Sequence, residues 1–241
     1  MPLTPVLHAE LLKIRTLRSL YGALFALLAV STAFSALAGT SGTSDPDFDP
    51  LFTAVSGVLP GQIAVMAFGT TAVSSEFHSG GLRLSLAAVP RRGRWFAAKL
   101  TAVALPALLT GLLTAGAALL AARAGLGDAA AGLTLGEQLR GVVGCGIYLT
   151  LMALLAAGLT AWLRSGIAAL GILVPLVLIV SFVIGDSAGT AADFLPDRAG
   201  QVVLHETWDG TLGPWTGLAV TALWTAAVTA AGAWSVWRRD A

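Results

Sequence analysis

The sequence predicts an all-α integral membrane protein with six transmembrane helices. The 241 residues include only 11% charged ones, and the mean hydropathy is +0.81. After Arg18 the charges stand in groups separated by six uncharged stretches. Because a helix needs about 20 apolar residues to cross the ~30 Å hydrocarbon core, each stretch is long enough for one span. Within a single domain, 1–241, the expected spans are about residues 19–39, 52–74, 98–122, 139–162, 165–186 and 213–236.

The charges between the spans predict the orientation. With the N-terminus inside, the cytoplasmic side receives eleven of the 14 basic residues and three of the 13 acidic ones. The other side receives three basic and ten acidic residues. Because basic side chains resist translocation, both termini are expected in the cytoplasm and the chain in the cell (plasma or inner) membrane.

An amphipathic helix is expected before the first span, over residues 4–18. Pro5 suits the first helical position, and Leu7, Leu11 and Ile14 recur at i, i+4 and i+7. We expect this helix to lie on the cytoplasmic membrane surface with its basic residues toward anionic headgroups. The alternative is a cytoplasmic extension of the first span.

Spans two, three and five each contain a proline, Pro60, Pro106 and Pro175. Proline removes an internal hydrogen bond and is expected to kink its helix. A capping box, Thr134 with Glu137, is expected to open span four. The segment 186–209 is too short to span and is expected to form a short re-entrant or interfacial helix.

Several classes of activity are disfavoured by what the sequence lacks. It has no phosphate-binding loop of the GxxxxGK[ST] type, no metal-ligand spacing and a single cysteine, Cys145. Six spans leave no room for a soluble catalytic domain, so the chain is not expected to be an enzyme. The span cores carry no ionisable residue of the kind that couples transport to a proton or sodium gradient. Energy is therefore expected to arrive from a separate chain.

A membrane-embedded hydrolase is a less favoured alternative. Gly39-Thr40-Ser41-Gly42 matches a GxSG pattern, and His205 or His78 would have to act as the base. Ser41 and His205 are expected in outer loops and His78 on the opposite side, which does not suit a buried catalytic pair. An ATP-independent secondary transporter is likewise disfavoured because the spans lack titratable groups.

The connection between spans two and three is the most informative polar segment. It reads Ser74-Ser75-Glu76-Phe77-His78-Ser79-Gly80-Gly81-Leu82-Arg83, followed by Val89-Pro90-Arg91-Arg92-Gly93-Arg94. With 10–19, 195–200, 214–218 and 237–241, it resembles in order the permease subunits of ABC-2 type ABC transporters. The resemblance covers the whole chain.

This resemblance implies a short cytoplasmic coupling helix between spans two and three that contacts a separate ATPase. By position, Glu76 and Phe77 would contact the ATPase and Arg83 would anchor the segment, with His78 and Gly80 between them. The implied assembly has two copies of an ABC ATPase, which bind ATP and Mg, and a second permease copy as a homodimer or a paralogous heterodimer. Membrane lipids are expected partners and nucleic acid is not. The alternative for this segment is a solvated loop held by lipid phosphates.

The resemblance also implies an ATP-driven exporter whose substrate passes between apposed copies of spans two and five. Thr53, Ser56, Gln62 and Ser181 offer a sparsely polar lining there. Such a wall suits an amphiphilic or hydrophobic substrate, such as a drug, an antibiotic or other natural product, or a lipid-like molecule. The alternative on the same scaffold is the permease of an immunity ABC complex that extracts a lipid or peptide from the membrane.

Overall fold

The described part of the chain is helical throughout its regular elements. The computed structural model describes residues 3–40, 48–77, 81–89, 91–127, 132–179, 189–208 and 210–238. Five helices are long and apolar enough to cross a membrane. They are α2 (Arg18–Gly39), α4 (Val58–Phe77), α6 (Arg92–Leu126), α8 (Leu135–Leu163) and α11 (Pro214–Arg238). The predicted all-α class is thus confirmed for the described residues, and the five long apolar helices are compatible with the predicted transmembrane character.

The sixth predicted span is only partly within the described residues. Helix α9 (Gly166–Pro175) continues as a π-helical turn through residues 176–179. This apolar segment, Gly166–Ile179, is shorter than the other five. The change from α to π geometry directly follows Pro175, whose ring cannot supply an N–H to the helix ladder. Five helices are compatible with predicted spans by length and composition, and the number of six spans stays a prediction.

The other two prolines do not end their helices. Pro60 lies in the first turn of α4, where its missing N–H has no intrahelical partner to lose. Helix α6 continues through Pro106 as one helix of 35 residues.

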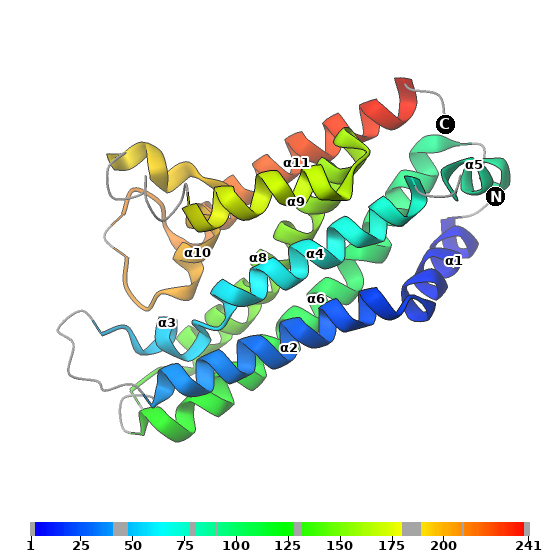
Figure 1. Ribbon diagram of the computed structural model, residues 1–241. Coiled ribbons are helices and arrows are strands. Elements are labelled where there is room, and N and C mark those ends of the chain that lie inside the picture. The colour runs from blue at the N-terminus through cyan, green and yellow to red at the C-terminus, as the bar shows by residue number, and fades with distance from the viewer. Residues whose placement is uncertain are drawn as a thin grey trace.

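Short elements gather at the two ends of the bundle (Figure 1). Helices α1 (Leu3–Thr16) and α5 (Gly81–Ala88) lie at one end together with the last turn of α11, and we call this the α5 end. The opposite α10 end holds α3 (Pro50–Val55), α10 (Pro196–Gln201) and the 3₁₀ turns Gly189–Phe194 and Val202–Leu204. The short helices expected at 4–18, between spans two and three, and within 186–209 are all present.

Predicted span two is not one continuous helix. Helix α3 ends at Val55, α4 begins at Val58, and a turn separates them. At Gly57 a Cβ atom would lie 1.9 Å from the carbonyl oxygen of Ser31 in α2, and the Gly57 N–H donates to Ser35 Oγ at 3.1 Å. At this turn the backbone passes so close to α2 that only glycine fits.

Helix α8 lies at the centre of the bundle and contacts α4, α6 and α11. Close approach is again made by glycine: a Cβ at Gly69 of α4 would lie 2.1 Å from the Ala153 carbonyl oxygen of α8. The expected capping box begins α8, with Thr134 Oγ1 accepting from Glu137 N and the Glu137 carboxylate accepting from Thr134 N. The apolar core thus holds α4 and α8 in fixed register and positions the polar clusters at both ends.

Candidate functional site

The α5 end contains a buried cluster of charged side chains from four helices. It comprises Glu10 and Lys13 of α1, Glu76 of α4, Ser85 of α5 and Lys99 of α6, and we call it the ion cluster. Lys99 Nζ donates to Glu76 Oε1 at 2.6 Å and also pairs with Glu10. Only 3% of Glu10, 5% of Glu76 and 4% of Lys99 is exposed. Side chains from four helices therefore form one connected network.

Glu76 is the centre of this cluster. Its Oε1 atom also accepts from Lys13 at 2.9 Å, and its Oε2 atom accepts from Ser85 Oγ at 2.9 Å. Lys13 in turn donates to Glu10 at 2.9 Å and to Ser85 at 3.2 Å. Two carboxylates and two ammonium groups leave the cluster without net charge, which offsets the cost of burying them.

Lys13 is the one charged member that remains open to water, with 41% of its side chain exposed. Burial of its inner part opposes the charged form. The hydrogen bonds to Glu76 and Glu10, together with the charges of these carboxylates, outweigh burial and raise the pKa of Lys13. Lys13 therefore keeps its proton and stays bound to both carboxylates.

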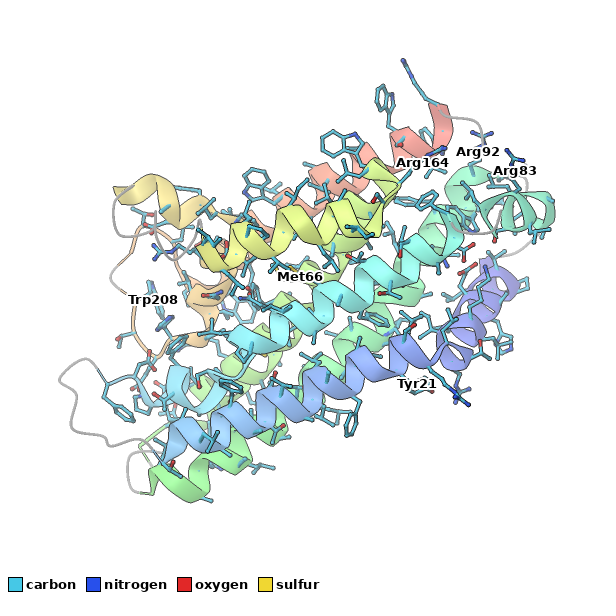
Figure 2. All side chains as sticks on the ribbon, in the orientation of Figure 1. Tyr21, Met66, Arg83, Arg92, Arg164 and Trp208 are labelled. Atoms are coloured by element: carbon cyan, nitrogen blue, oxygen red, sulfur yellow. The ribbon has the colours of Figure 1, made fainter. Side chains whose placement is uncertain are left out.

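The residues expected to contact an ATPase occupy different environments. The Glu76 carboxylate points into the protein and is not available at the surface. Phe77 is half-buried, and the Arg164 guanidinium carbon lies 5.9 Å from its ring centroid. Arg83 is exposed on α5 (Figure 2), whereas His78 and Gly80 lie outside the described residues. Glu76 is thus buried and hydrogen-bonded to Ser85 of α5, and the ATPase contact stays a prediction.

An apolar groove borders the ion cluster on its water-facing side. It has a volume of about 480 Å³ and lies between α1, α5 and the start of α6. Leu84, 74% exposed, stands at its α5 wall, and Glu10, Lys13 and Ser85 also line it. The α5 end therefore presents an exposed apolar side chain, Leu84, beside a groove lined in part by members of the ion cluster.

The predicted pathway residues are only partly brought together. Gln62 is buried, and the Tyr148 hydroxyl of α8 donates to its Oε1 atom. Gln201 of α10 donates to the same hydroxyl at 3.2 Å. Gln62 and Gln201 line a mainly apolar pocket of about 380 Å³ that also includes Val177 and Leu178 of the π-helical turn after α9 and the charged residues Asp197 and Arg198. This polar triad was not expected from the sequence.

Thr53 and Ser56 do not line that pocket. Thr53 lies in α3, and Ser56 in the turn that follows donates its hydroxyl to the Thr53 carbonyl at 2.9 Å. Ser56 therefore satisfies a helix end. Ser181 lies outside the described residues.

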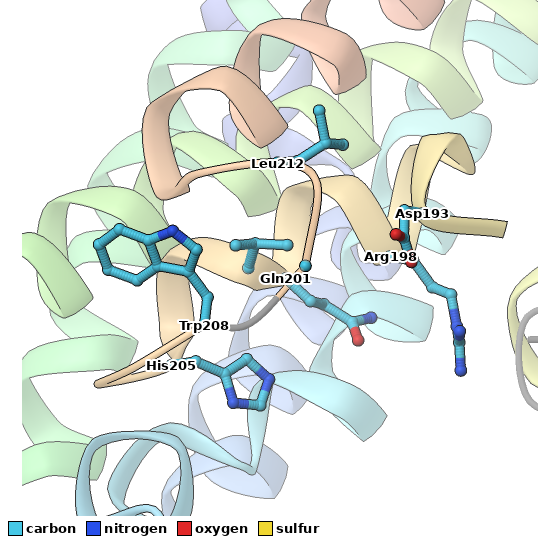
Figure 3. A pocket seen from close by; sticks show the side chains of 8 residues that line it. Asp193, Arg198, Gln201, His205, Trp208 and Leu212 are labelled. Atoms are coloured by element: carbon cyan, nitrogen blue, oxygen red, sulfur yellow. The ribbon is translucent and has the colours of Figure 1, made fainter. Parts of the chain in front are cut away.

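The α10 end holds a second polar pocket, of about 230 Å³, lined by His205, Trp208, Arg198 and Asp193 among others (Figure 3). His205 Nδ1 lies 3.0 Å from Asp49 Oδ2, and its ring stacks on Phe52 with 4.3 Å between centroids. Burial opposes ionisation of Asp49. The hydrogen bonds from His205 and from the backbone N–H groups of Phe52 and Glu206 outweigh it and lower the pKa of Asp49.

His205 is therefore held by a carboxylate and an aromatic ring. Ser41, the nucleophile required by the hydrolase alternative, lies outside the described residues. Within the described ranges, no group of three His, Cys, Asp or Glu side chains is placed to hold a metal ion.

No protein-family model matches the chain, and a search of curated proteins found no similar sequence. The functional assignment therefore rests on the residues and their arrangement.

Proposed function

We propose that this chain is the membrane-spanning permease subunit of an ATP-driven ABC exporter with six spans and both termini in the cytoplasm. The chain supplies no ATPase site, and two copies of a separate ATPase, together with a second permease copy, complete the assembly. The α5 end is its cytoplasmic end, consistent with the excess of basic residues in the segments that gather there.

The ion cluster is the observation that carries this proposal. Glu76 and Lys99 stand near the ends of the long helices α4 and α6, and Ser85 ties α5 to the same carboxylate. A push on the exposed face of α5 is transmitted to both helices, because breaking a buried pair costs about 3–5 kcal/mol. Such a rigid connection suits mechanical input from a neighbouring chain.

The ATPase contact is proposed to be made by exposed residues of α5 and by the adjoining groove. Arg83 supplies a charge, Leu84 supplies an apolar anchor, and the groove accepts a side chain of the partner. Glu76 and Phe77 act as positioning residues behind this surface. This retains the predicted location of coupling while changing which side chains touch the partner.

The proposed substrate is an amphiphilic or hydrophobic molecule. The pocket beside Gln62 and Gln201 is walled mainly by apolar side chains of α4 and of the π-helical turn after α9. Its polar lining consists of these two amides and the charged side chains of Asp197 and Arg198, which can orient the polar part of a ligand. A drug, a natural product or a lipid-like molecule matches this lining.

Copurification tests the proposal. The tagged chain, expressed with its neighbouring genes, is expected to recover an ATPase, and Arg83→Glu with Leu84→Ser is expected to release it while the protein stays inserted. Leu223→Ser, at a 70% exposed position of α11 away from α5, is the matched control. Substrate movement in vesicles that requires an ion gradient and no ATP would contradict the proposal and favour a secondary transporter.

A further inference from the structure

A second groove lies on the side of α1 that faces away from the ion cluster. It has a volume of about 460 Å³ and is formed by α1, the first turns of α2 and the middle of α6. Leu105 and Leu109 of α6 form its apolar wall with Leu12, and each is more than one-third exposed. This volume lies within the range of about 300–1,000 Å³ that is typical of ligand pockets.

One rim of this groove is basic. His8 and Arg15 of α1 line it, and no acidic residue does. Within the described residues, neither side chain has a hydrogen-bond or ion-pair partner. Arg18, also exposed, follows at the start of α2. The groove thus combines an unneutralised guanidinium with a long apolar surface. It is complementary to an anionic amphiphile, whose negative head would face Arg15 and whose apolar tail would lie along the groove.

On α6 the groove covers residues 105–110, which at 1.5 Å per residue extend over about 8 Å. An occupant with its charged head at Arg15 would therefore place apolar groups beside Leu105 and Leu109.

We propose that this groove binds one anionic glycerophospholipid of the leaflet at the α5 end. Arg15 binds the phosphate, Arg18 adds to the positive field, His8 offers a ring N–H as a hydrogen-bond donor, and one acyl chain lies against Leu105 and Leu109. The lipid bridges α1 and α6, the same helices that Glu10 and Lys99 join on the other side of α1. The proposal requires that the protein be embedded in a membrane and does not require an ATPase partner.

Native mass spectrometry of the full chain in detergent, with phosphatidylglycerol and phosphatidylcholine of identical acyl chains, tests this site. Both lipids offer Arg15 a phosphate, but the choline ammonium of phosphatidylcholine neutralises that charge and is repelled by the basic rim. We therefore expect one phosphatidylglycerol to bind about tenfold more tightly than phosphatidylcholine. Arg15→Ala should remove this preference and Arg15→Lys should keep most of it. Arg91→Ala, which removes an exposed basic residue at the same end but outside the groove, should have no effect.

Two further arms separate the other possible occupants. Leu109→Trp fills the groove and should weaken binding of both lipids, whereas glycerol phosphate, which lacks acyl chains, should not displace the bound lipid. Equal binding of both lipids by the wild type, or an equal loss with Arg91→Ala, would overturn the proposal in favour of diffuse surface charge. A change of oligomeric state in Leu109→Trp with lipid binding intact would assign the groove to a second copy of the chain.

Discussion

Replacing Glu76 by glutamine tests the ion cluster most directly. The substitution keeps the size of the side chain and removes the charge that Lys99 and Lys13 share. Lys99, 4% exposed, then retains Glu10 alone, and two ammonium groups face one carboxylate. The buried cluster gains a net positive charge.

The magnitude follows from which pairs are buried. Removing one partner of a buried ion pair costs about 3–5 kcal/mol. The Lys13 part of the loss is smaller because 41% of that side chain is exposed and water screens the pair. The amide can still accept a hydrogen bond from Ser85, so we expect a destabilisation near the lower limit, about 3 kcal/mol.

The measurement is unfolding of the purified protein in mixed micelles, by titration with a denaturing detergent and detection by circular dichroism. Glu206→Gln, a carboxyl change at the α10 end, is the control and should leave the midpoint unchanged. Combining Glu76→Gln with Lys99→Met leaves Glu10 paired with Lys13 and should recover about 2 kcal/mol relative to Glu76→Gln alone. If Glu76→Gln and Glu206→Gln unfold at the same midpoint, or the double variant is no more stable than Glu76→Gln, the cluster does not hold the helices together.

Three further predictions follow from the two ends of the bundle. Because the pKa of Lys13 is raised above 10.5, its contribution to stability is complete below pH 10.5 and is lost as pH rises through the raised value. A thermal-shift titration should show this alkaline step in the wild type, and Lys13→Met should abolish it. Because the pKa of Asp49 is lowered below 3.8, its contribution is complete above pH 3.8 and is lost as pH falls through the lowered value, and tryptophan fluorescence should report an acid step that Asp49→Asn lacks. Gly57→Ala should destabilise the fold by about 1–3 kcal/mol because its Cβ would meet the Ser31 backbone. Gly116→Ala, with open space around the added methyl group, is the control and should not destabilise it. Equal unfolding midpoints for the two variants would contradict the close packing of α2 on the α3–α4 turn.

Periodicity and hydropathy were sufficient to predict the helices, because burial in a membrane leaves a direct signal in composition. The turn at Gly57 and its contact with α2 were not predicted, since Gly57 and Ser35 are more than twenty residues apart in the chain. The glycine between Ser56 and Pro60 was the feature of the sequence that could have indicated a turn. The sequence predicted a short helix between spans two and three but could not identify the surface that it exposes.

The partners of Glu76 were beyond sequence reasoning for the same reason. Lys13 is separated from Glu76 by 63 residues and Lys99 by 23, so their pairing depends on how four helices pack. The i, i+3 spacing of Glu10 and Lys13 was a visible hint, but it is equally typical of an exposed helix face. An acidic residue alone in a basic segment was the stronger signal that Glu76 has a specific partner.

The composition of the ion cluster also bears on how energy enters the protein. A site that couples transport to protons needs a group that changes charge near the working pH. The contacts that Lys13 makes raise its pKa further from neutrality, so it holds its proton under physiological conditions. A group that holds its proton joins helices but does not carry protons, so Lys13 fits the proposed mechanical role of the α5 end and does not fit ion coupling.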